Sequence, residues 1–252
     1  MFPGDILLME KINKYEYPYH WSLQGFWQKA YEKPLEYFNA KLSKNDVILD
    51  IGCGDGRLTA LIAGRVKRVI AIDHQQFPLD MAGVICRHLG IKNVKFEIGD
   101  ARKLKYKDCG FDVVTCFDVI EHLPREDAER MINEISRVLK KDGWMCLTTP
   151  NRKNLTARIF GHKLIEKHYY EYSVKELKKI FERDFTDIKF IGVTMPLPIP
   201  RIEHFANVLP FRWVFNWLIG VGKNHPKLAK TILMIARKQS LLEKGLVSPK
   251  GK

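Results

Sequence analysis

The sequence predicts an α/β protein built around a doubly wound, mostly parallel β-sheet. Short apolar runs rich in β-branched residues alternate with stretches of helical spacing along much of the chain. The runs are continuous rather than alternating in polarity, which is typical of strands covered on both faces by crossover helices. The chain has 252 residues, 46% of them hydrophobic, which suffices for one domain with a sizeable core.

The N-terminal part, 1–46, is expected to form a helical cap that precedes the sheet. A helical pattern begins at Ser22 and is expected to be interrupted at Pro34, because proline suits a new first turn but breaks an existing helix. The helical pattern then resumes at Leu35.

The next part, 47–150, contains the predicted core of the sheet, where the cofactor is expected. Strands are expected at 47–51, 69–72, 94–97, 112–116 and 144–148. Helices are expected at 56–66, 79–89 and 125–140. Asp142 and Gly143 are expected to stop the last of these helices.

The part from 151 to 240 is expected to complete a single domain on the substrate side. Helices are predicted at 154–166 and 173–183, and strands at 188–193 and 231–237. The insertion 194–230 between the last two strands is long and rich in proline and aromatic residues. We expect it to be a lid over a substrate, an interfacial helix or an extra packing layer. Residues 241–252 are typical of a frayed tail.

The net charge of +13 is concentrated in one part of the chain, since residues 151–252 carry 20 Lys and Arg against 8 Asp and Glu. Such basicity attracts nucleic acid, an anionic bilayer or an acidic substrate, or it belongs to an ordinary solvated surface.

The 5 cysteines form no CxxC pair, which favours a reducing, cytoplasmic location over a disulfide framework. The longest apolar run, 213–221, is too short for a membrane span, and Asp5 and Glu10 argue against a signal peptide.

A glycine-rich turn, DIGCGDG at 50–56, follows the first predicted strand. Glycines here let the chain turn sharply and let a ligand approach main-chain N–H groups. The spacing is GxGxG, and Arg57 stands where a dinucleotide-binding turn carries its third glycine. A pyrophosphate cofactor is therefore disfavoured, because Asp50 and Asp55 would repel phosphate while suiting a cation.

Acidic residues recur at the ends of the following strands. Asp73 ends the second strand and is placed to accept hydrogen bonds from both hydroxyls of a ribose. Asp100, beside Ala101, can accept from an adenine amino group, and Asp118 ends the fourth strand. One such acid is often just a turn or N-cap residue, but the series predicts a single nucleoside at one edge of the sheet.

The segments DIGCGDG, AIDH at 71–74, GDA at 99–101 and FDVVTCFDVIEHL at 111–123 together resemble the class I S-adenosylmethionine-dependent methyltransferases. The resemblance covers about residues 45–150. It implies a Rossmann-like sheet of seven strands in the order 3-2-1-4-5-7-6, with the last strand antiparallel. It also implies S-adenosylmethionine as the cofactor, whose sulfonium charge suits nearby carboxylates.

The same resemblance implies that the cofactor lies over Gly52 and Gly54, with its ribose at Asp73, its adenine at Asp100 and its methionine part near Asp118. Cys53 and His74 are mild departures from the family pattern. The residues expected to bind the cofactor are Asp50, Ile51, Gly52, Cys53, Gly54, Asp73, His74, Asp100, Ala101, Phe117 and Asp118.

His122 is the candidate catalytic residue. If 118–122 formed one helical turn, Asp118, Glu121 and His122 would share a face and could bind a divalent ion. His122 could instead act alone as a general base, or the Glu-His pair could simply brace the loop. We assign no residue to a metal. Residues that could line the acceptor pocket, or belong to the core, are His20, Trp21, His168, Tyr169 and Tyr170.

The acceptor class follows from the segment 117–123 together with TPNR at 149–152, which looks like the quinone-biosynthesis O-methyltransferases and their small-molecule relatives. The resemblance implies transfer to an oxygen or nitrogen of a small-molecule or lipid-like acceptor. One alternative is an RNA methyltransferase that uses the basic C-terminal part. Others are a membrane-surface isoprenoid or glycolipid methyltransferase, with peripheral contact through 205–221, and a non-enzymatic binding protein.

Overall fold

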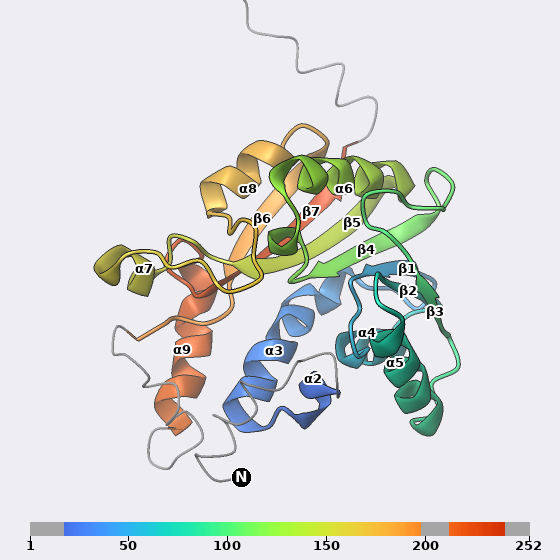
Figure 1. Cartoon of the computed structure of the whole chain (residues 1–252), viewed down its shortest axis with the longest axis horizontal. Helices are drawn as coiled ribbons and strands as arrows, with labels where there is room; N and C mark the ends of the chain where they lie inside the picture. Colours follow the sequence, from blue (N-terminus) through green and yellow to red (C-terminus); the bar gives the residue numbers. More distant parts are fainter. Residues whose placement is uncertain (1–17, 198–211, 240–252) are drawn as a thin grey trace, which may run out of the picture.

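The computed structural model describes residues 18–197 and 212–239 and contains one seven-stranded sheet in the order β3-β2-β1-β4-β5-β7-β6 (Figure 1). Strands β1 to β5 pair in parallel, and β7 runs antiparallel to both β5 and β6. The predicted order and the antiparallel last strand are confirmed. The strands are β1 (Val47–Ile51), β2 (Arg68–Asp73), β3 (Val94–Ile98), β4 (Phe111–Phe117), β5 (Leu139–Pro150), β6 (Phe185–Gly192) and β7 (Thr231–Lys238).

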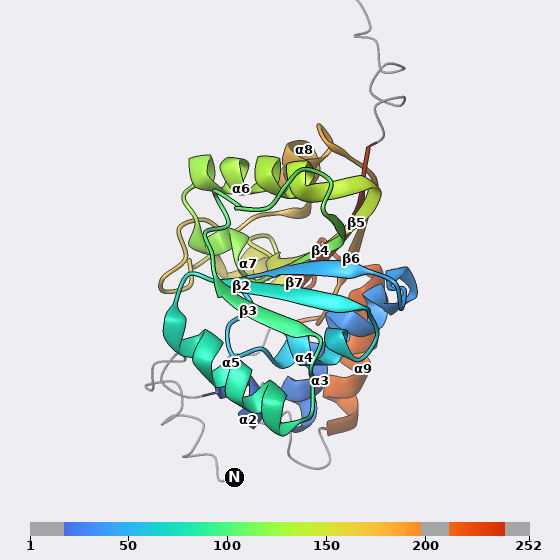
Figure 2. The same cartoon turned by 90° about the vertical axis from the view of Figure 1, so that its right-hand side faces the viewer.

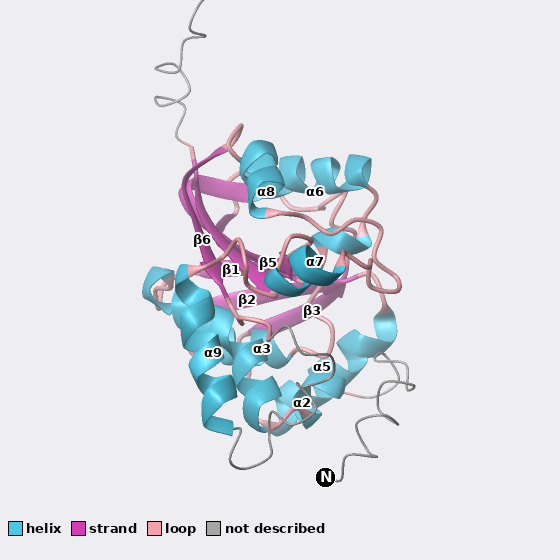
Figure 3. Cartoon of the chain, turned by 90° about the vertical axis from the view of Figure 1, so that its left-hand side faces the viewer, coloured by secondary structure: helices cyan, strands magenta, loops and turns pink. Residues whose placement is uncertain are grey.

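Helices cover both faces of this sheet. Helices α3, α4, α5 and α9 lie on one face and α6 and α8 on the other, as two perpendicular views show (Figures 1 and 2). Figure 3 shows the strands between these two layers, with α7 at the near side. The helices are α2 (Tyr19–Ser22), α3 (Gly25–Phe38), η1 (Asn39–Lys41), α4 (Arg57–Ala63), α5 (Gln76–His88), η2 (Ile120–His122), α6 (Arg125–Val138), α7 (Leu155–Phe160), α8 (Val174–Phe181) and α9 (Arg212–Asn224).

Neighbouring residues of β1 enter different halves of the core, because successive side chains of a strand point to opposite faces. Ile48 packs in a cluster with Phe38 and Ile62 from α3 and α4. Leu49 packs in a second cluster with Ile135 from α6. The central strand is therefore buried on both faces, as its continuous apolar run predicts. No helix within the described ranges is both long and apolar enough to cross a membrane.

The predicted break at Pro34 is wrong. Helix α3 runs unbroken from Gly25 to Phe38 with Pro34 inside it. An interior proline costs about 3 kcal/mol through a lost hydrogen bond and a backbone clash. Pro34 is itself buried beside Leu35 and Phe38, and packing of this turn against the sheet offsets that cost.

Several predicted helices end earlier than expected, and they include α4, which ends at Ala63 rather than at 66, and α8, which ends at Phe181 rather than at 183. Helix α6 stops at Val138, and Leu139 already pairs with Phe111 as the first residue of β5. The register of this pairing then shifts, so Asp142 adopts a left-handed conformation within the irregular start of β5 instead of ending a helix. Helix α7 ends at Phe160 rather than at 166, because Gly161 follows with φ +84°.

The insertion 194–230 is confirmed between β6 and β7, although its part 198–211 lies outside the described residues, as do 1–17 and the predicted tail. Its helix α9 packs against α3 through Leu218, Ile219 and Phe26. A lid function stays a prediction. At the end of β6 the backbone of α9 approaches so closely that a Cβ atom on Gly192 would overlap the carbonyl oxygen of Gly222.

Asp50 is a buried acid that ties three elements together at the end of β1. Its side chain is 2% exposed, and its carboxylate accepts hydrogen bonds from Thr59 of α4 at 2.6 Å and from Thr115 of β4 at 2.7 Å. Burial raises the pKa of Asp50 to about 6, although the two hydroxyl groups oppose this shift.

The close contact between β6 and α9 predicts the effect of a single methyl group. Gly192→Ala should destabilise the fold by about 1–3 kcal/mol, because the backbone of α9 must move. Gly220→Ala is the matched control, since a Cβ there meets no atom within 4 Å and should stabilise the helix by about 0.5–1 kcal/mol. Urea unfolding measures both, and equal stability of the two variants would contradict the packing of α9 described here.

The raised pKa of Asp50 predicts a pH-dependent stability. The folded protein holds this proton up to about pH 6, whereas the unfolded chain releases it near pH 4. The resulting stabilisation is complete below about pH 4 and is lost as pH rises through about 6. Asp50→Asn has no such proton, so its stability relative to the wild type should rise by about 3 kcal/mol between these pH values. Urea unfolding across this range tests the prediction, and a constant difference would contradict it.

Candidate active site

The glycine-rich turn lies where β1 ends between β2 and β4. The amides of Gly52 and Cys53 donate to the carbonyl oxygen of Ile72 at 2.8 and 3.0 Å. Gly52 has φ +70°, and a Cβ atom there would overlap the side chain of Val119. At Gly54, with φ +51°, a Cβ atom would meet nothing within 4 Å. The turn is therefore closed against β2 at Gly52 and open at Gly54, where a ligand can approach the backbone.

Asp73 lies directly against the open part of the turn. Its side chain is 6% exposed, and its two oxygens accept from the amides of Gly54 at 3.0 Å and Gln75 at 3.1 Å. His74 is largely exposed, and its Nδ1 lies 3.2 Å from Asp73 Oδ1. Asp73 thus places a carboxylate beside the turn, at the position where the sequence predicts a ribose.

Asp100 and Ala101 follow β3, the neighbour of β2. Asp100 is half-exposed and pairs with Arg102 at 2.8 Å, and this pairing lowers the pKa of Asp100. His74 also acts on Asp100 by its charge, so the two side chains belong to the same region. Ala101 is half-buried and packs against the main core. A ligand at Asp100 would share the carboxylate with Arg102.

Asp118 directly follows β4 in a strained conformation, with φ +53° in a residue other than glycine. Its amide donates to the carbonyl oxygen of Thr148 at 3.1 Å, and the Thr148 hydroxyl donates to Asp118 Oδ1 at 2.9 Å. The expected helical turn over 118–122 is therefore wrong, because a 3₁₀ turn begins only at Ile120. Asp118 does not share a helix face with Glu121 and His122.

The remaining predicted residues of the turn and strand ends are mostly buried. Ile51 and Phe117 are 1% and 9% exposed and belong to the two core clusters, so they support the strand ends from within. Cys53 is half-buried, and burial followed by the charge of Asp50 raises the pKa of its thiol.

Tyr31 of α3 is influenced by three acids of the candidate site, and no motif in the sequence indicates this. Burial raises the pKa of its hydroxyl, followed in order by the charges of Asp55, Asp118 and Asp50. These acids come from the glycine-rich turn, the end of β4 and the end of β1, and all act on one phenol. The helical spacing around Tyr31 indicates only which helix face it occupies, so its place among the acids depends on tertiary packing.

Helix α2 is anchored to the glycine-rich turn through Asp55, which is 4% exposed. The His20 amide donates to Asp55 Oδ2 and the Trp21 indole N–H to the Asp55 carbonyl oxygen, both at 2.8 Å. The His20 ring stacks on Tyr31 with a centroid separation of 4.4 Å. His20 and Trp21, expected to line an acceptor pocket, thus connect the N-terminal cap to the turn.

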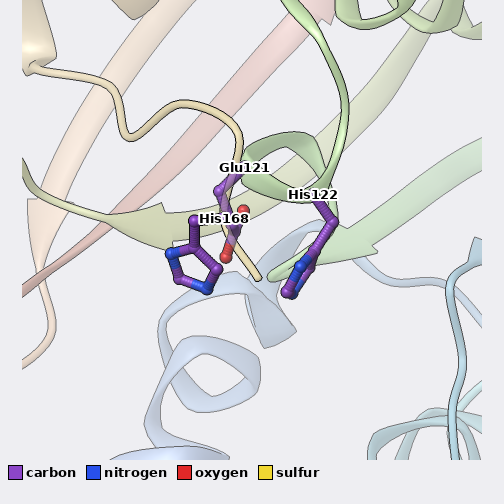
Figure 4. Close-up of side chains that lie close together, drawn as sticks. All are labelled: Glu121, His122 and His168. Atoms are coloured by element: carbon purple, nitrogen blue, oxygen red, sulfur yellow. The ribbon is translucent and has the colours of Figure 1, made fainter. Parts of the chain in front are cut away.

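Glu121, His122 and His168 form a cluster beyond the end of β4 (Figure 4). One nitrogen or oxygen atom from each lies within 4.8 Å of the others, so the three side chains could hold a metal ion. The rings of His122 and His168 meet edge-on at 4.7 Å. Nothing in the sequence indicates this pairing, because 46 positions separate the two histidines.

The two histidines of this cluster have distinct supports. His122 Nδ1 lies 3.1 Å from the carbonyl oxygen of Lys167, so a neutral His122 carries its hydrogen on Nδ1 and its lone pair on Nε2. His168 Nδ1 lies 2.8 Å from the carboxylate of Glu171, which is 3% exposed. Glu121 is 1% exposed and accepts from Thr149 at 3.0 Å. Burial, followed by the charge of Asp118, raises the pKa of Glu121, which favours a neutral carboxyl group.

The two tyrosines after His168 have different surroundings. Tyr169 is 66% exposed. Tyr170 donates to Glu176 and lies beneath the guanidinium groups of Arg125 and Arg152. Tyr170 therefore belongs to a network that supports the start of α8.

Comparisons with known proteins identify the family of this chain. A family described as a methyltransferase domain matches residues 42–193. The chain is 37% identical over 217 residues to the demethylmenaquinone methyltransferase of Lactobacillus johnsonii, covering 82% of this chain and 83% of that protein. It is 32% identical over 123 residues to the ubiquinone biosynthesis O-methyltransferase of Leptothrix cholodnii, covering 48% of this chain and about half (52%) of that protein.

A solved structure shows the same fold. The N-methyltransferase NodS from Bradyrhizobium japonicum, in complex with S-adenosyl-L-homocysteine, matches with a TM-score of 0.62 and 14% identity over 88% of this chain and 92% of that chain. Together with the family match and the relatives, these observations show that the chain belongs to the class I S-adenosylmethionine-dependent methyltransferases, with a Rossmann-like fold and relatives named as demethylmenaquinone and ubiquinone-biosynthesis methyltransferases.

Proposed function

We propose that this methyltransferase transfers the methyl group to a hydroxyl oxygen of a small quinol-type or phenolic acceptor, and that His122 removes the hydroxyl proton. The observation that carries the proposal is the position of the His122 ring. Its Nδ1 faces the carbonyl oxygen of Lys167, which directs the lone pair of the neutral ring to Nε2. The names of the quinone relatives supply the acceptor class.

The residues around the glycine-rich turn fit S-adenosylmethionine. The backbone at Gly54 has room for a ligand, and Asp73 offers oxygens to a ribose. Asp100 and Ala101 would receive the adenine, and Asp118 the methionine part. The sulfonium and ammonium charges would lie near Asp50, Asp55 and Asp118, the acids whose charges raise the pKa of Tyr31. When bound, S-adenosylmethionine supplies an electrophilic methyl group and leaves as a neutral thioether.

The work of the protein in such a displacement is alignment, exclusion of water and removal of one proton. The hydroxyl proton of the acceptor moves to His122 Nε2. A lone electron pair on the deprotonated oxygen then forms the new bond to the methyl carbon. The carbonyl oxygen of Lys167 then accepts the Nδ1–H of the imidazolium. The His168 ring, held by Glu171, packs edge-on against His122 and fixes its orientation.

A second possible role for the same cluster is to bind a divalent ion. Its ligands would be Glu121, His122 and His168, whose ligand atoms lie within 4.8 Å of one another. Such an ion would acidify an acceptor hydroxyl directly. The two roles differ in their response to chelators.

The RNA alternative stays a prediction that salt-dependent retention on RNA would test. Peripheral membrane contact through 205–221 also stays a prediction, and within its described part Trp213 and Trp217 are exposed.

Asp73→Asn should weaken binding of S-adenosylhomocysteine by about 10- to 100-fold, because each hydrogen bond to a charged acceptor contributes about 1.5–3 kcal/mol. Calorimetric titration measures this affinity. Asp80→Asn, at an exposed position on α5, is the control and should bind as the wild type does. An unchanged affinity of the Asp73 variant would contradict the proposed ribose site.

His122→Ala should lower kcat by about 10²- to 10⁴-fold, the usual contribution of a general base, and leave the affinity for S-adenosylhomocysteine unchanged. His88→Ala, at an exposed end of α5, is the control. Turnover is followed by mass spectrometry of O-methylated products from water-soluble catechols and hydroquinones. Unchanged kcat would contradict the base. Activity that a chelator abolishes and a divalent ion restores, with equal loss in His122→Ala and His168→Ala, would assign the metal role instead.

A further inference from the structure

The segment from Arg152 to Lys167 exposes apolar side chains that most folded proteins bury. It contains the short helix α7, which projects from the side of the molecule (Figures 1 and 3). The side chains at its end and just after it are 45–61% exposed, and they are Ile159, Phe160, Leu164 and Ile165. Four large apolar residues so close together in one projecting segment are costly in water and mark a contact surface.

Basic side chains surround these apolar residues. Lys153, Arg158, Lys163 and Lys167 are all exposed, and Glu166 is the single acidic residue between 152 and 167. Within residues 18–197 and 212–239, none of these four cations forms an ion pair with a carboxylate. By contrast, Arg102, Arg137 and Arg237 elsewhere on the surface are each paired with acids. These four cations next to the apolar residues therefore carry positive charge that no carboxylate of the described residues neutralises.

A hollow of about 320 Å³ lies at the base of α7, lined by Arg152, Lys153, Ala157, Arg158 and His162. The Arg158 guanidinium is held over it by hydrogen bonds to the carbonyl oxygens of Lys153 at 2.8 Å and Lys227 at 3.3 Å. The Nε atom of Arg152 is buried and has no hydrogen-bond partner among the described residues, whereas its Nη2 is paired with Glu176 at 2.6 Å. The lining thus offers fixed cationic donors to an anionic oxygen.

We propose that this segment, 152–167, docks the enzyme on an anionic phospholipid bilayer. Headgroup phosphates occupy the hollow beside Lys153 and Arg158, and Ile159, Phe160, Leu164 and Ile165 enter the interfacial region of the lipid. Apolar side chains alternating with unpaired cations on one projecting segment match a surface that is anionic outside and apolar just beneath. A nucleic acid would complement the cations but would leave the aliphatic side chains without a partner.

The docking segment is physically joined to the histidine cluster. The amide of Ile165 donates to Glu171, which also holds His168, and the amide of His168 donates to the carbonyl oxygen of Ile165. Docking would therefore bring the acceptor side of the site close to the lipid. This benefit rests on the proposed function, whereas vesicle binding itself does not.

The test is flotation of the full chain with vesicles of phosphatidylcholine alone or mixed with phosphatidylglycerol. The wild type should float with the anionic vesicles, and high salt should weaken its binding. Ile159→Ser/Phe160→Ser and Lys153→Glu/Arg158→Glu should each weaken binding about tenfold or more. Matched controls, Val84→Ser/Leu89→Ser and Lys92→Glu/Lys107→Glu, change equally exposed residues elsewhere and should keep it.

A second measurement does not depend on the folding of charge-reversed variants. In a Cys109→Ser background, an environment-sensitive fluorophore on Phe160→Cys should shift to the blue with anionic vesicles and be quenched by nitroxide lipids. The same probe on Val84→Cys should do neither. Failure to bind anionic vesicles, equal binding to neutral ones, equal loss in the control variants, or a probe at position 160 that stays in water would each overturn the proposal. Binding that persists in catalytically inactive His122→Ala separates this inference from the proposed function.

Discussion

Buried negative charge at the carboxyl ends of adjacent strands is the constraint on which the site depends. Asp50, Asp55 and Asp73 are only 2–6% exposed. Within the described residues, their side chains are hydrogen-bonded to hydroxyl groups and backbone amides and paired with histidines rather than with Lys or Arg. Removing a carboxylate from water is costly unless a positive charge compensates. A cationic cofactor would supply that compensation, which is the role that the proposed function gives to the sulfonium.

The N-terminal cap completes this arrangement. Helix α3 carries Tyr31, whose pKa is raised by burial and by the charges of Asp55, Asp118 and Asp50, and α2 is joined to the glycine-rich turn by two hydrogen bonds to Asp55. The cap and the turn therefore form one unit although they are distant in sequence. A cofactor that contacts the turn would also affect the position of α2, because Asp55 connects the two.

Much of the sheet could be predicted from sequence, because buried parallel strands leave continuous apolar runs that end in Gly or Asp. Asp50, Asp73 and Asp118 follow from the same rule, since parallel strands end at a common edge. The left-handed Asp118 and the unbroken helix through Pro34 could not be predicted. Both oppose local preference and are held by tertiary contacts, Thr148 for the first and burial against the sheet for the second.

Contacts between residues that are distant in sequence could not be predicted either. His168 meets His122 only because the segment after α7 returns to the end of β4, where the amide of Tyr169 donates to the carbonyl oxygen of Glu121 at 2.8 Å. A crystal structure of the full chain with S-adenosylhomocysteine tests the central claim most directly. The account predicts the ribose hydroxyls on Asp73 and the amino group of the ligand beside Asp118 and Tyr31. A ligand bound away from the glycine-rich turn, or acids turned away from it, would contradict the account.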